Sequence, residues 1–290
     1  AGEASAWEYG ETEVAVFEDA EAFPASLARV RRMKLYGEYA QSLDRVLYRV
    51  CGALSVVGGP LDGVFRPSTA ELGVSSDTAL VRAAEEGVGA AVDGHEIAIG
   101  RGDYMLRSGV KMYYDAEDEE QIAAGKTTIL FAADNGRLMA KFYITYKLDE
   151  DFEKVVERLY KNGIRSVLRT YDPYIREDLV NKIGYIAPYG VKVRHKTASE
   201  LNDMALPRLD SGLVSKSSPR DMLKTVLACR HTRRLIQGLE WGAFAVSCAC
   251  MVASVTLAAV GMLTTLPALV WTGAHLSGVL AVALIVKIHG

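Results

Sequence analysis

The sequence predicts an α/β fold with a parallel sheet, followed by a transmembrane helical hairpin. Residues 137–168 read in order as a strand, an amphipathic helix and a second strand, which is typical of parallel α/β domains. Near the C-terminus, two apolar runs of 21 residues lie next to each other at 243–263 and 266–286. Each run is long enough to cross a bilayer as a helix.

Composition narrows the functional classes. The chain has 290 residues, and its 33 Lys and Arg against 36 Asp and Glu give a net charge of −3. This near-balance argues against a nucleic-acid partner attracted by bulk charge. The mean hydropathy of +0.09 is high for a chain with 24% charged residues. The apolar excess is local, because residues 243–286 contain no Asp, Glu, Lys or Arg and a single histidine, His275.

The elements of the first half follow from local patterns. Glu13–Phe17 reads as a short buried strand, and an acidic turn follows it. Apolar residues recur at helical spacing from Ser26 to Leu54, so we expect a helical region that ends at Gly58-Gly59-Pro60. Thr78–Glu86 is also expected to be helical. Asp93-Gly94 between two alternating runs predicts a β-hairpin.

The second half of the soluble region has clearer signals. Lys126–Ala132 and Arg137–Ile144 are β-rich, with a turn at 134–136 between them. Asp149–Lys161 predicts an amphipathic helix, Gly163 ends it, and Ile164–Leu168 predicts a buried strand. This order places a parallel sheet after the hairpins.

The flanks of the apolar runs predict how the chain lies in a membrane. Residues 264–267 form the turn between the two spans. Arg230, Arg233 and Arg234 precede the first span and Lys287 follows the second, so the positive-inside tendency places both ends in the cytoplasm. We therefore expect an integral membrane protein with cytoplasmic soluble domains and the lipid membrane as a partner. The alternative is a buried helical hairpin in a soluble protein.

Three stretches resemble the heavy-metal (copper/zinc) class of cation-transporting P-type ATPases. Gly87-Val88 through Asp93-Gly94 to Gly100 is similar to the nucleotide-binding hairpins of that class. Gly125-Lys126-Thr127 through Leu168-Arg169-Thr170-Tyr171-Asp172 resembles the return into its phosphorylation domain. The segment from Arg233-Arg234 to Leu266-Pro267-Ala268 resembles its last two membrane helices. By this resemblance the chain corresponds to the C-terminal half of such an ATPase.

The resemblance implies a domain layout and a function. It places a haloacid-dehalogenase-like phosphorylation-type domain at 11–24 and 147–228, an inserted α+β nucleotide-binding-type domain at 25–146, and the transmembrane hairpin at 229–290. It implies ATP-driven transport of a transition-metal cation, with ATP and Mg²⁺ as cofactors. It also implies a partner: the missing N-terminal half, with an actuator domain and further membrane helices, in the same gene or in another chain.

The phosphorylation motif of that family departs from its pattern here. The family uses an aspartate in a D-K-T-G-T loop as the nucleophile that takes phosphate from ATP. An alignment on Phe17 puts Glu18 at that position, and a shift by one puts Asp19 there. Neither register restores the Lys, the Thr or the Gly. The longer Glu18 side chain moves the carboxylate by ~1.5 Å, and a misplacement of about 1 Å can cost on the order of 10²-fold in rate.

Other motifs are degenerate in parallel. The T-G-D loop reads Thr170-Tyr171-Asp172, and the hinge D-P reads Thr145-Tyr146. The magnesium motif keeps Asn202-Asp203, with Ser199 in place of its key aspartate. In the nucleotide domain the H-P pair reads Thr78-Ala79, and Glu85 replaces the first glycine of G-x-G. The resemblance thus assigns catalytic roles to Glu18, Asp19, Thr170, Asp172 and Asp203, and nucleotide contacts to Gly87, Val88 and Gly100.

The membrane spans suggest one metal cluster. In a hairpin that turns at 264–265, His275 lies at the depth of Ser254, and Cys250 and Met251 lie one turn away on the same face. Imidazole, thiolate and thioether ligands suit a soft transition metal, and a histidine at mid-bilayer is costly. The alternative is polar packing, with His275 hydrogen-bonded to a nearby hydroxyl such as that of Ser247.

Three functions remain open from the sequence. The first is a metal-transporting ATPase with degraded phosphorylation motifs. The second is a catalytically inactive pseudo-ATPase that serves as a membrane-anchored regulator or scaffold. The third is a small phosphatase that uses Asp19 with Glu21, in the manner of paired acids in haloacid-dehalogenase-like enzymes.

Overall fold

The computed structural model describes residues 3–69, 73, 75–124, 127–183, 186–201, 218–261 and 268–289. The chain divides into two compact units. One unit contains Glu13–Pro207 with Ser218–Arg220, and the other contains Ala1–Thr12, Arg208–Ser217 and Asp221–Gly290. The first of these units carries all the strands described below.

A parallel three-stranded sheet confirms the predicted α/β class. Strands β1 (Val14–Glu18), β8 (Arg165–Thr170) and β9 (Lys192–His195) lie in the order β1-β8-β9, and both neighbouring pairs are parallel. Helix α7 (Glu150–Lys161) packs on this sheet, and the ring of Phe152 meets the ring of Phe17 edge-on at 5.1 Å.

The first strand is only half buried, so the prediction of a buried strand at Glu13–Phe17 was wrong in part. Ala15 and Phe17 point into the core, whereas Val14 and Val16 are exposed. The alternation arises because successive side chains of a strand point to opposite faces, and the core covers only one face of β1. Helix α2 (Asp19–Ala22) begins directly after it.

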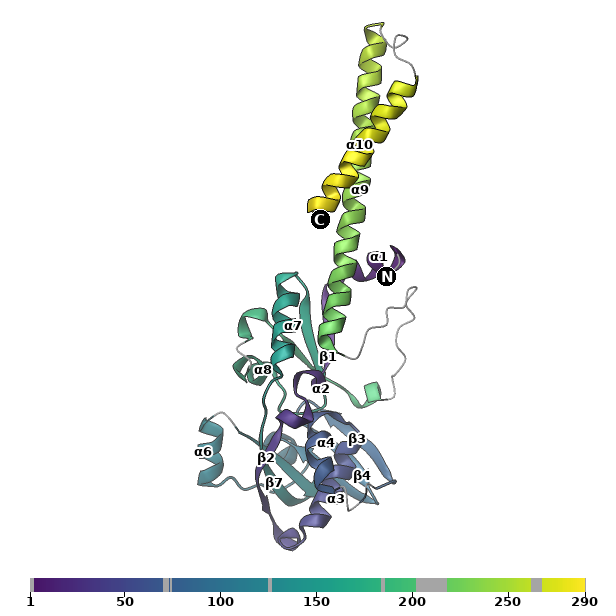
Figure 1. Cartoon of the computed structure of the whole chain (residues 1–290). Helices are drawn as coiled ribbons and strands as arrows, with labels where there is room; N and C mark the ends of the chain where they lie inside the picture. Colours follow the sequence, from purple (N-terminus) through teal and green to yellow (C-terminus); the bar gives the residue numbers. More distant parts are fainter. Residues whose placement is uncertain are drawn as a thin grey trace. The chain divides into compact units, whose positions relative to one another are not determined.

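A six-stranded antiparallel sheet is inserted in the chain between β1 and β8. Its order is β2-β7-β6-β5-β4-β3. The strands are β2 (Arg29–Leu35), β3 (Thr78–Ala84), β4 (Gly87–Val92), β5 (His95–Gly100), β6 (Thr128–Asp134) and β7 (Arg137–Thr145). Figure 1 shows β2 beside β7, in agreement with their pairing.

Two helical predictions were wrong, and both concern the outer strands of this sheet. The region from Ser26 to Leu54 contains strand β2 before helix α3 (Leu43–Ser55), and Thr78–Glu86 forms β3 instead of a helix. Short apolar runs do not separate helix from strand by periodicity alone. Pairing with β7 and β4 satisfies the backbone groups of the two strands on their inner sides.

Both hairpin predictions were confirmed. Asp93 and Gly94 have φ values of 49° and 77°, and Asn135 and Gly136 have φ values of 47° and 77°. Two consecutive residues with positive φ are characteristic of the type I′ turn, whose twist matches that of paired strands.

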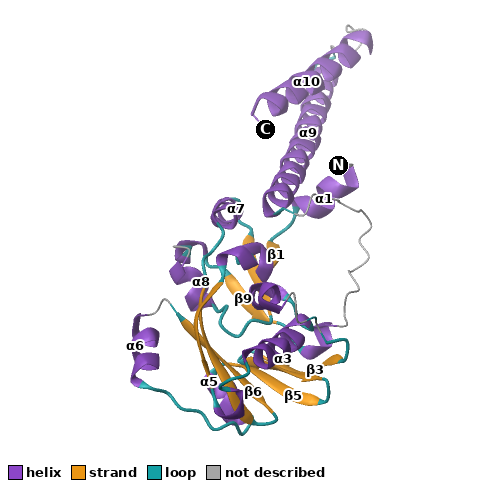
Figure 2. Cartoon of the chain, turned by 60° about the horizontal axis from the view of Figure 1, so that its bottom comes forward, coloured by secondary structure: helices purple, strands orange, loops and turns teal. Residues whose placement is uncertain are grey.

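Helices cover both faces of the inserted sheet (Figure 2). Phe142 of β7 packs on Phe65 of helix α4 (Gly59–Phe65), with ring centroids 4.8 Å apart. Its neighbour Tyr143 points to the opposite face and joins a buried cluster with residues of helix α5 (Gly102–Arg107). Neighbouring side chains of β7 therefore pack against helices on opposite faces of the sheet.

The remaining short helices are α6, α8 and five 3₁₀ turns. Helix α6 (Ala116–Ala124) is fastened by a buried ion pair, in which the Lys141 ammonium lies 2.5 Å from the Asp118 carboxylate. The others are α8 (Glu177–Ile183), η1 (Ala25–Leu27), η2 (Gly37–Tyr39), η3 (Arg66–Thr69), η4 (Ala187–Tyr189) and η5 (Ala198–Leu201).

The other unit contains helices α1 (Glu3–Gly10), α9 (Pro219–Ala259) and α10 (Ala268–His289). Among the described residues, α9 is the one helix long and apolar enough to cross a membrane, and Val270–Leu284 of α10 is a shorter apolar helix. The predicted turn at 264–267 lies outside the described residues. Helices α9 and α10 touch closely, because a Cβ atom on Gly242 would lie 1.9 Å from the Val282 side chain.

Candidate functional site

Four of the predicted site residues meet at the carboxyl ends of the parallel strands. Glu18 ends β1, Asp19 follows it, Thr170 ends β8, and Asp172 lies two residues beyond. This edge is where parallel α/β sheets collect functional side chains, because their strands all end there. The topology therefore brings together residues about 150 positions apart in sequence.

A hydrogen-bonded chain joins the two aspartates. The Thr170 hydroxyl donates to Asp19 Oδ2 at 2.6 Å, and the Asp172 amide donates to Thr170 Oγ1 at 2.8 Å. All three side chains are buried. The acidic residues that were expected to form a turn after the first strand therefore form helix α2, and Asp19 in this helix is buried.

Asp172 is held by two tyrosines. The Tyr146 hydroxyl donates to its Oδ2 at 2.6 Å, and the Tyr174 amide donates to its Oδ1 at 2.9 Å. Burial raises the pKa of Asp172 to about 7, the nearby Asp19 charge adds to this rise, and the two hydrogen bonds oppose it. Near neutral pH this carboxyl group therefore exchanges a proton and is not a permanent anion.

Asp19 is covered by the backbone of Gly59, the first residue of helix α4. Burial raises its pKa, against the opposing effects of the Thr170 hydrogen bond and the Lys196 charge. A Cβ atom on Gly59 would lie 3.0 Å from Asp19 Oδ2 and 3.2 Å from Oδ1, so the Gly59 backbone lies directly against the carboxylate. Gly59 has a φ of 86°, a conformation that favours glycine.

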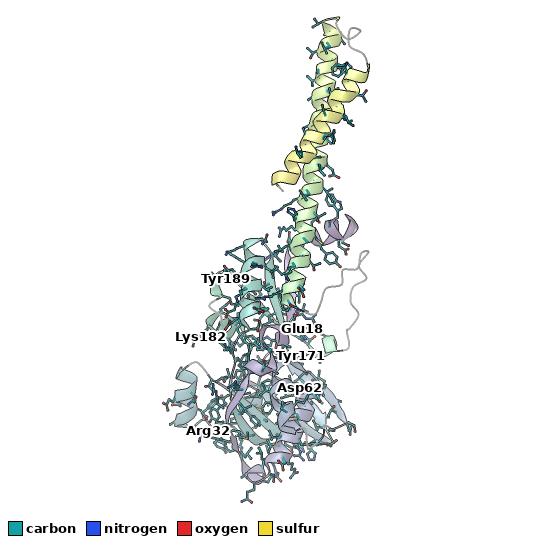
Figure 3. The ribbon with its side chains drawn as sticks, viewed as in Figure 1. Glu18, Arg32, Asp62, Tyr171, Lys182 and Tyr189 are labelled. Carbon is teal, nitrogen blue, oxygen red and sulfur yellow. The ribbon has the colours of Figure 1, made fainter. Side chains whose placement is uncertain are left out.

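Glu18 is half exposed, and its carboxylate is paired with a lysine of the same site. The Lys196 ammonium forms an ion pair with its carboxylate and lies 5.1 Å from the centre of the Tyr171 ring. Figure 3 shows Glu18 and Tyr171 near one another. The Glu18 amide donates to Glu21 Oε2 at 2.9 Å, which closes a capping box at the start of α2.

Lys196 and Tyr146 are site residues that the sequence analysis did not assign. Lys196 directly follows β9, and a lysine just beyond a parallel strand is a sequence signal that could have identified it as a site residue. Tyr146 was noted only where it replaces part of a hinge motif. Its contact with Asp172 depends on the return of the chain from the inserted sheet, which no local pattern shows.

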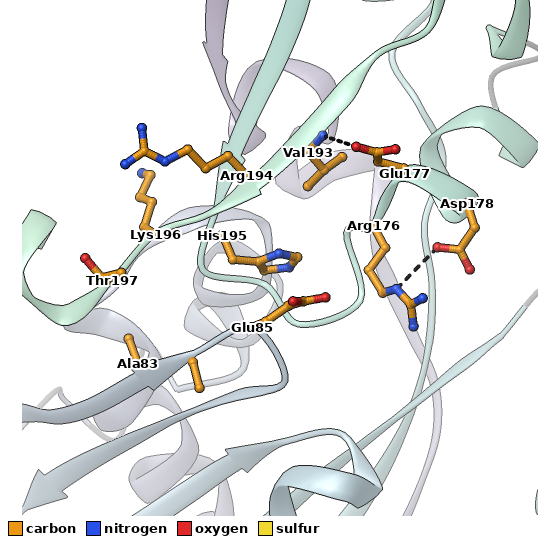
Figure 4. A pocket seen from close by; sticks show the side chains of 11 residues that line it. Ala83, Glu85, Arg176, Glu177, Asp178, Val193, Arg194, His195, Lys196 and Thr197 are labelled. Atoms are coloured by element: carbon orange, nitrogen blue, oxygen red, sulfur yellow. Dashed lines mark hydrogen bonds and ion pairs between the residues drawn. The ribbon is translucent and has the colours of Figure 1, made fainter.

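A cleft of about 740 Å³ opens beside this site (Figure 4). His195 lies on it, with Nε2 3.2 Å from the backbone oxygen of Asp172, and burial lowers the pKa of His195. Glu85 projects toward His195 from the end of β3. Positive and negative side chains both line the cleft, and two of them, Arg176 and Asp178, form an ion pair at 3.4 Å.

The three predicted nucleotide contacts are buried. Gly87 and Gly100 are paired across β4 and β5, and the Tyr104 ring lies against both of them. A Cβ atom on Gly87 would lie 2.5 Å from this ring, and one on Gly100 would lie 2.9 Å from it. Val88 points to the other face and is also buried. The glycines thus make room for the Tyr104 ring, and the nucleotide role of Gly87, Val88 and Gly100 stays a prediction.

The position expected for the His-Pro pair lies within a strand. Thr78 and Ala79 lie within strand β3, where they pair with Val92 and Ala91 of β4. A Gly-Pro pair, Gly59-Pro60, occurs instead at the start of helix α4.

The residues that the structure describes do not form a complete magnesium site. Asp203 lies outside the described residues. Elsewhere in the described chain, no three His, Cys, Asp or Glu side chains are grouped as metal ligands. Three carboxylate oxygens of Asp19 and Asp172 accept hydrogen bonds from Thr170, Tyr146 and the Tyr174 amide.

The predicted cluster in the apolar helices is not assembled as expected. His275 Nε2 lies 3.0 Å from Ser247 Oγ, so the histidine is level with Ser247 and the predicted level of Ser254 was wrong. Cys250 is half buried, whereas Met251 is 68% exposed. This contact with Ser247 is the polar packing that the sequence offered as the alternative to a metal cluster. The metal role of these three residues stays a prediction.

Comparison with solved structures returns P-type ATPases among the similar chains. No protein-family model matches the chain, and no curated protein matches it in sequence. A zinc-transporting PIB-type ATPase in an E2.Pi state is similar over 98% of this chain and 50% of its own, at 11% identity and a TM-score of 0.43. The chain thus spans half the length of that structure.

Two smaller structures are also similar. The catalytic domain of a CPx-ATPase covers 65% of this chain and 63% of its own, at 13% identity and a TM-score of 0.38. The N-domain of a copper-transporting P-type ATPase covers 41% of this chain and 98% of its own, at 14% identity and a TM-score of 0.31. At these scores and identities the likeness assigns neither the family nor the activity.

Proposed function

We propose that the chain is a membrane-anchored relative of metal-transporting P-type ATPases that no longer transfers phosphate: a pseudo-ATPase acting as a regulator or scaffold. The observation that carries this proposal is the closed state of the site. One acid, Glu18, is neutralised by Lys196, and the other, Asp19, is capped by Thr170 and covered by Gly59.

The relationship to P-type ATPases rests on order along the chain. The three similar stretches occur in the family's sequence order. An antiparallel sheet is inserted after the first parallel strand, where the resemblance expects the nucleotide-type domain. A long apolar helix follows the soluble part, and none of its most apolar 18-residue stretch is buried.

Loss of phosphoryl transfer follows from what the reaction needs. A carboxylate oxygen must attack the γ-phosphorus of ATP in line, so that an O–P bond forms while ADP leaves with the electrons of the broken bond. Asp19 is buried and already accepts the Thr170 hydroxyl group, and the half-exposed Glu18 carboxylate is already paired with Lys196. The missing Lys, Thr and Gly of the loop remove charge-stabilising donors, each of which can supply about 10²–10³-fold in rate.

The cleft beside the site supports the same proposal. The Glu85 carboxylate lies on it, at the position where the family has a glycine. A negative charge there repels the polyphosphate of a nucleotide, whereas a glycine lets the backbone approach it. Tyr104 fills the space in front of Gly87 and Gly100, so both features disfavour nucleotide binding in the family's manner.

As partners we propose the lipid bilayer and a segment or chain that carries the remaining half of the ATPase architecture. The apolar face of α9 exposes large side chains, including Phe244, Val252 and Val255. These suit lipid tails or neighbouring apolar helices. The soluble domains then lie in the cytoplasm, on the side of the arginines that precede the apolar run.

Acid-quenched phosphorylation tests the proposal. Full-length protein is incubated with γ-labelled ATP and Mg²⁺, and the proposal predicts no acid-stable label. Label that disappears in Glu18→Gln or Asp19→Asn would restore the active transporter. Hydrolysis of a generic phosphate ester that is lost in Asp19→Asn would instead establish the phosphatase.

A further inference from the structure

A small pocket lies where the chain enters and leaves the inserted domain. Leu27 precedes β2 and Arg29 begins it, whereas Thr145 ends β7 and Lys147 follows it. We call these two junctions the entering and the returning linker. The two linkers are joined, since the Lys147 amide donates to the Leu27 oxygen at 3.1 Å and Arg29 pairs with Thr145 across β2 and β7. The pocket has a volume of about 320 Å³.

This hinge pocket carries an excess of positive charge. Arg29, Arg31 and Lys147 line it together with the hydroxyl groups of Ser26 and Thr145. None of the described residues that line it is acidic. Arg31 Nε donates to the Thr145 hydroxyl at 3.3 Å, which holds one guanidinium group at the pocket wall.

The cations of the hinge pocket are poorly neutralised. Within the described part of the chain, neither Arg29 nor Arg31 forms an ion pair with a carboxylate. Lys147 has Glu150 at 3.7 Å, but both side chains are more than 60% exposed, so water screens this pair. Three positive side chains around one concavity give it a net positive charge, which attracts an anion.

An alternative explanation covers part of this pattern. Charged side chains on an edge strand prevent pairing with other sheets, and β2 is an edge strand. That explanation accounts for Arg32, which is exposed on β2 away from the pocket. It does not account for Lys147, which belongs to a different segment and lines the same pocket.

We propose that the hinge pocket binds a small soluble anion with a phosphate or diphosphate group, which bridges the two linkers. Guanidinium groups match phosphate oxygens in pairs, and an ammonium group adds a point charge. Tyr146 also lines the pocket, and its hydroxyl donates to Asp172. Binding at the hinge therefore stiffens the connection between the inserted domain and the candidate site, and supplies a regulatory input to the proposed pseudo-ATPase.

Thermal unfolding of the full-length protein tests this site. Inorganic pyrophosphate at millimolar concentration is compared with sodium chloride at equal ionic strength. We expect pyrophosphate to raise the Tm of the unmodified protein by about 2–5 °C. The rise should fall to less than half in Arg29→Gln and in Arg31→Gln, whose side chains are exposed and whose loss leaves the core intact. Arg32→Gln is the matched control, with the same charge change on the same strand.

Each outcome decides the question. A shift that is reduced in Arg29→Gln and Arg31→Gln but kept in Arg32→Gln supports the hinge site. An equal loss in Arg32→Gln would show that bulk charge causes the effect and would overturn the proposal. An unchanged shift in Arg31→Gln, or no shift in the unmodified protein, would overturn it as well. None of these results depends on whether the protein forms an acyl phosphate, so the test is separate from that of the proposed function.

Discussion

Replacement of Asp172 by asparagine should remove a specific pH dependence of folding stability. The folded-state pKa of Asp172 is about 7, because of burial and the nearby Asp19, against an ordinary value of 3.8. Between these two values the unfolded chain has lost the proton that the folded protein still holds. Stability contributed by this group is therefore complete below about pH 4 and is lost as the pH rises to about 7.

The magnitude follows from the same two values. The slope for one proton is about 1.4 kcal/mol per pH unit, so a rise over about three units removes on the order of 4 kcal/mol. In Asp172→Asn the contribution of residue 172 to the pH dependence of the unfolding free energy should vanish. The remaining pH dependence should include a loss of stability with rising pH from Asp19, whose pKa is also raised. Tyr146→Phe removes a hydrogen bond that lowers the pKa of Asp172, so it should move the upper limit of the window above pH 7.

Urea unfolding of the full-length protein at a series of pH values measures this difference. The near-ultraviolet circular dichroism of the tyrosines reports the soluble part, which contains most of them. Asp178→Asn is the matched control, because that carboxylate is largely exposed on the same domain. If Asp172→Asn and the unmodified protein lose stability equally between pH 4 and pH 7, the buried, proton-holding state of Asp172 is refuted.

Three further predictions concern single contacts. Gly59→Ala forces a positive φ on alanine and puts a Cβ atom 3.0 Å from Asp19 Oδ2, so it should lower the free energy of unfolding by about 1–3 kcal/mol in urea titrations, and no loss would contradict the close approach. Lys196→Met removes a charge that lowers the pKa of Asp19, so carbon-13 NMR of aspartate carboxyls should show Asp19 titrating at higher pH, and an unchanged or lower value would exclude this interaction. Gly242→Leu puts atoms where Val282 lies and should separate α9 from α10, so cross-linking of an engineered cysteine pair between them should fall several-fold; undiminished cross-linking would contradict the packing.

Elements with strong local signals were predictable. Asp149 caps the start of helix α7, because its side chain accepts hydrogen bonds from the Asp151 and Phe152 amides, and Gly163 with a φ of 71° follows the helix. Both ends are therefore specified by residues next to them. The same holds for the hairpin turn at Asp93-Gly94, because few residues other than Asp, Asn and Gly tolerate its backbone angles.

Outer strands of the inserted sheet were not predictable, because their structure depends on partners distant in the chain. Strand β2 pairs with β7, more than 100 residues away, and its Arg-rich sequence has no clear alternation of apolar and polar residues. Strand β3 contains alanines that suit a helix as well as a strand. Tertiary pairing overrides such weak preferences.

Several residues of the candidate site were predictable, but their environment was not. Glu18, Asp19, Thr170 and Asp172 were found through motif positions, and the structure places them together. The burial of Asp19 was not visible in the sequence, because it depends on the Gly59 backbone, which comes from a different part of the chain.

Trapping with beryllium fluoride tests the central claim most directly. This compound mimics a phosphoryl group on an ionised carboxylate, so it requires an accessible oxygen at Glu18 or Asp19. Purified full-length protein with Mg²⁺ and beryllium fluoride should show no bound fluoride signal in fluorine NMR, because both acids are already occupied by contacts within the protein. A bound signal that disappears in Glu18→Gln or in Asp19→Asn would contradict the account and show a site that still accepts phosphate.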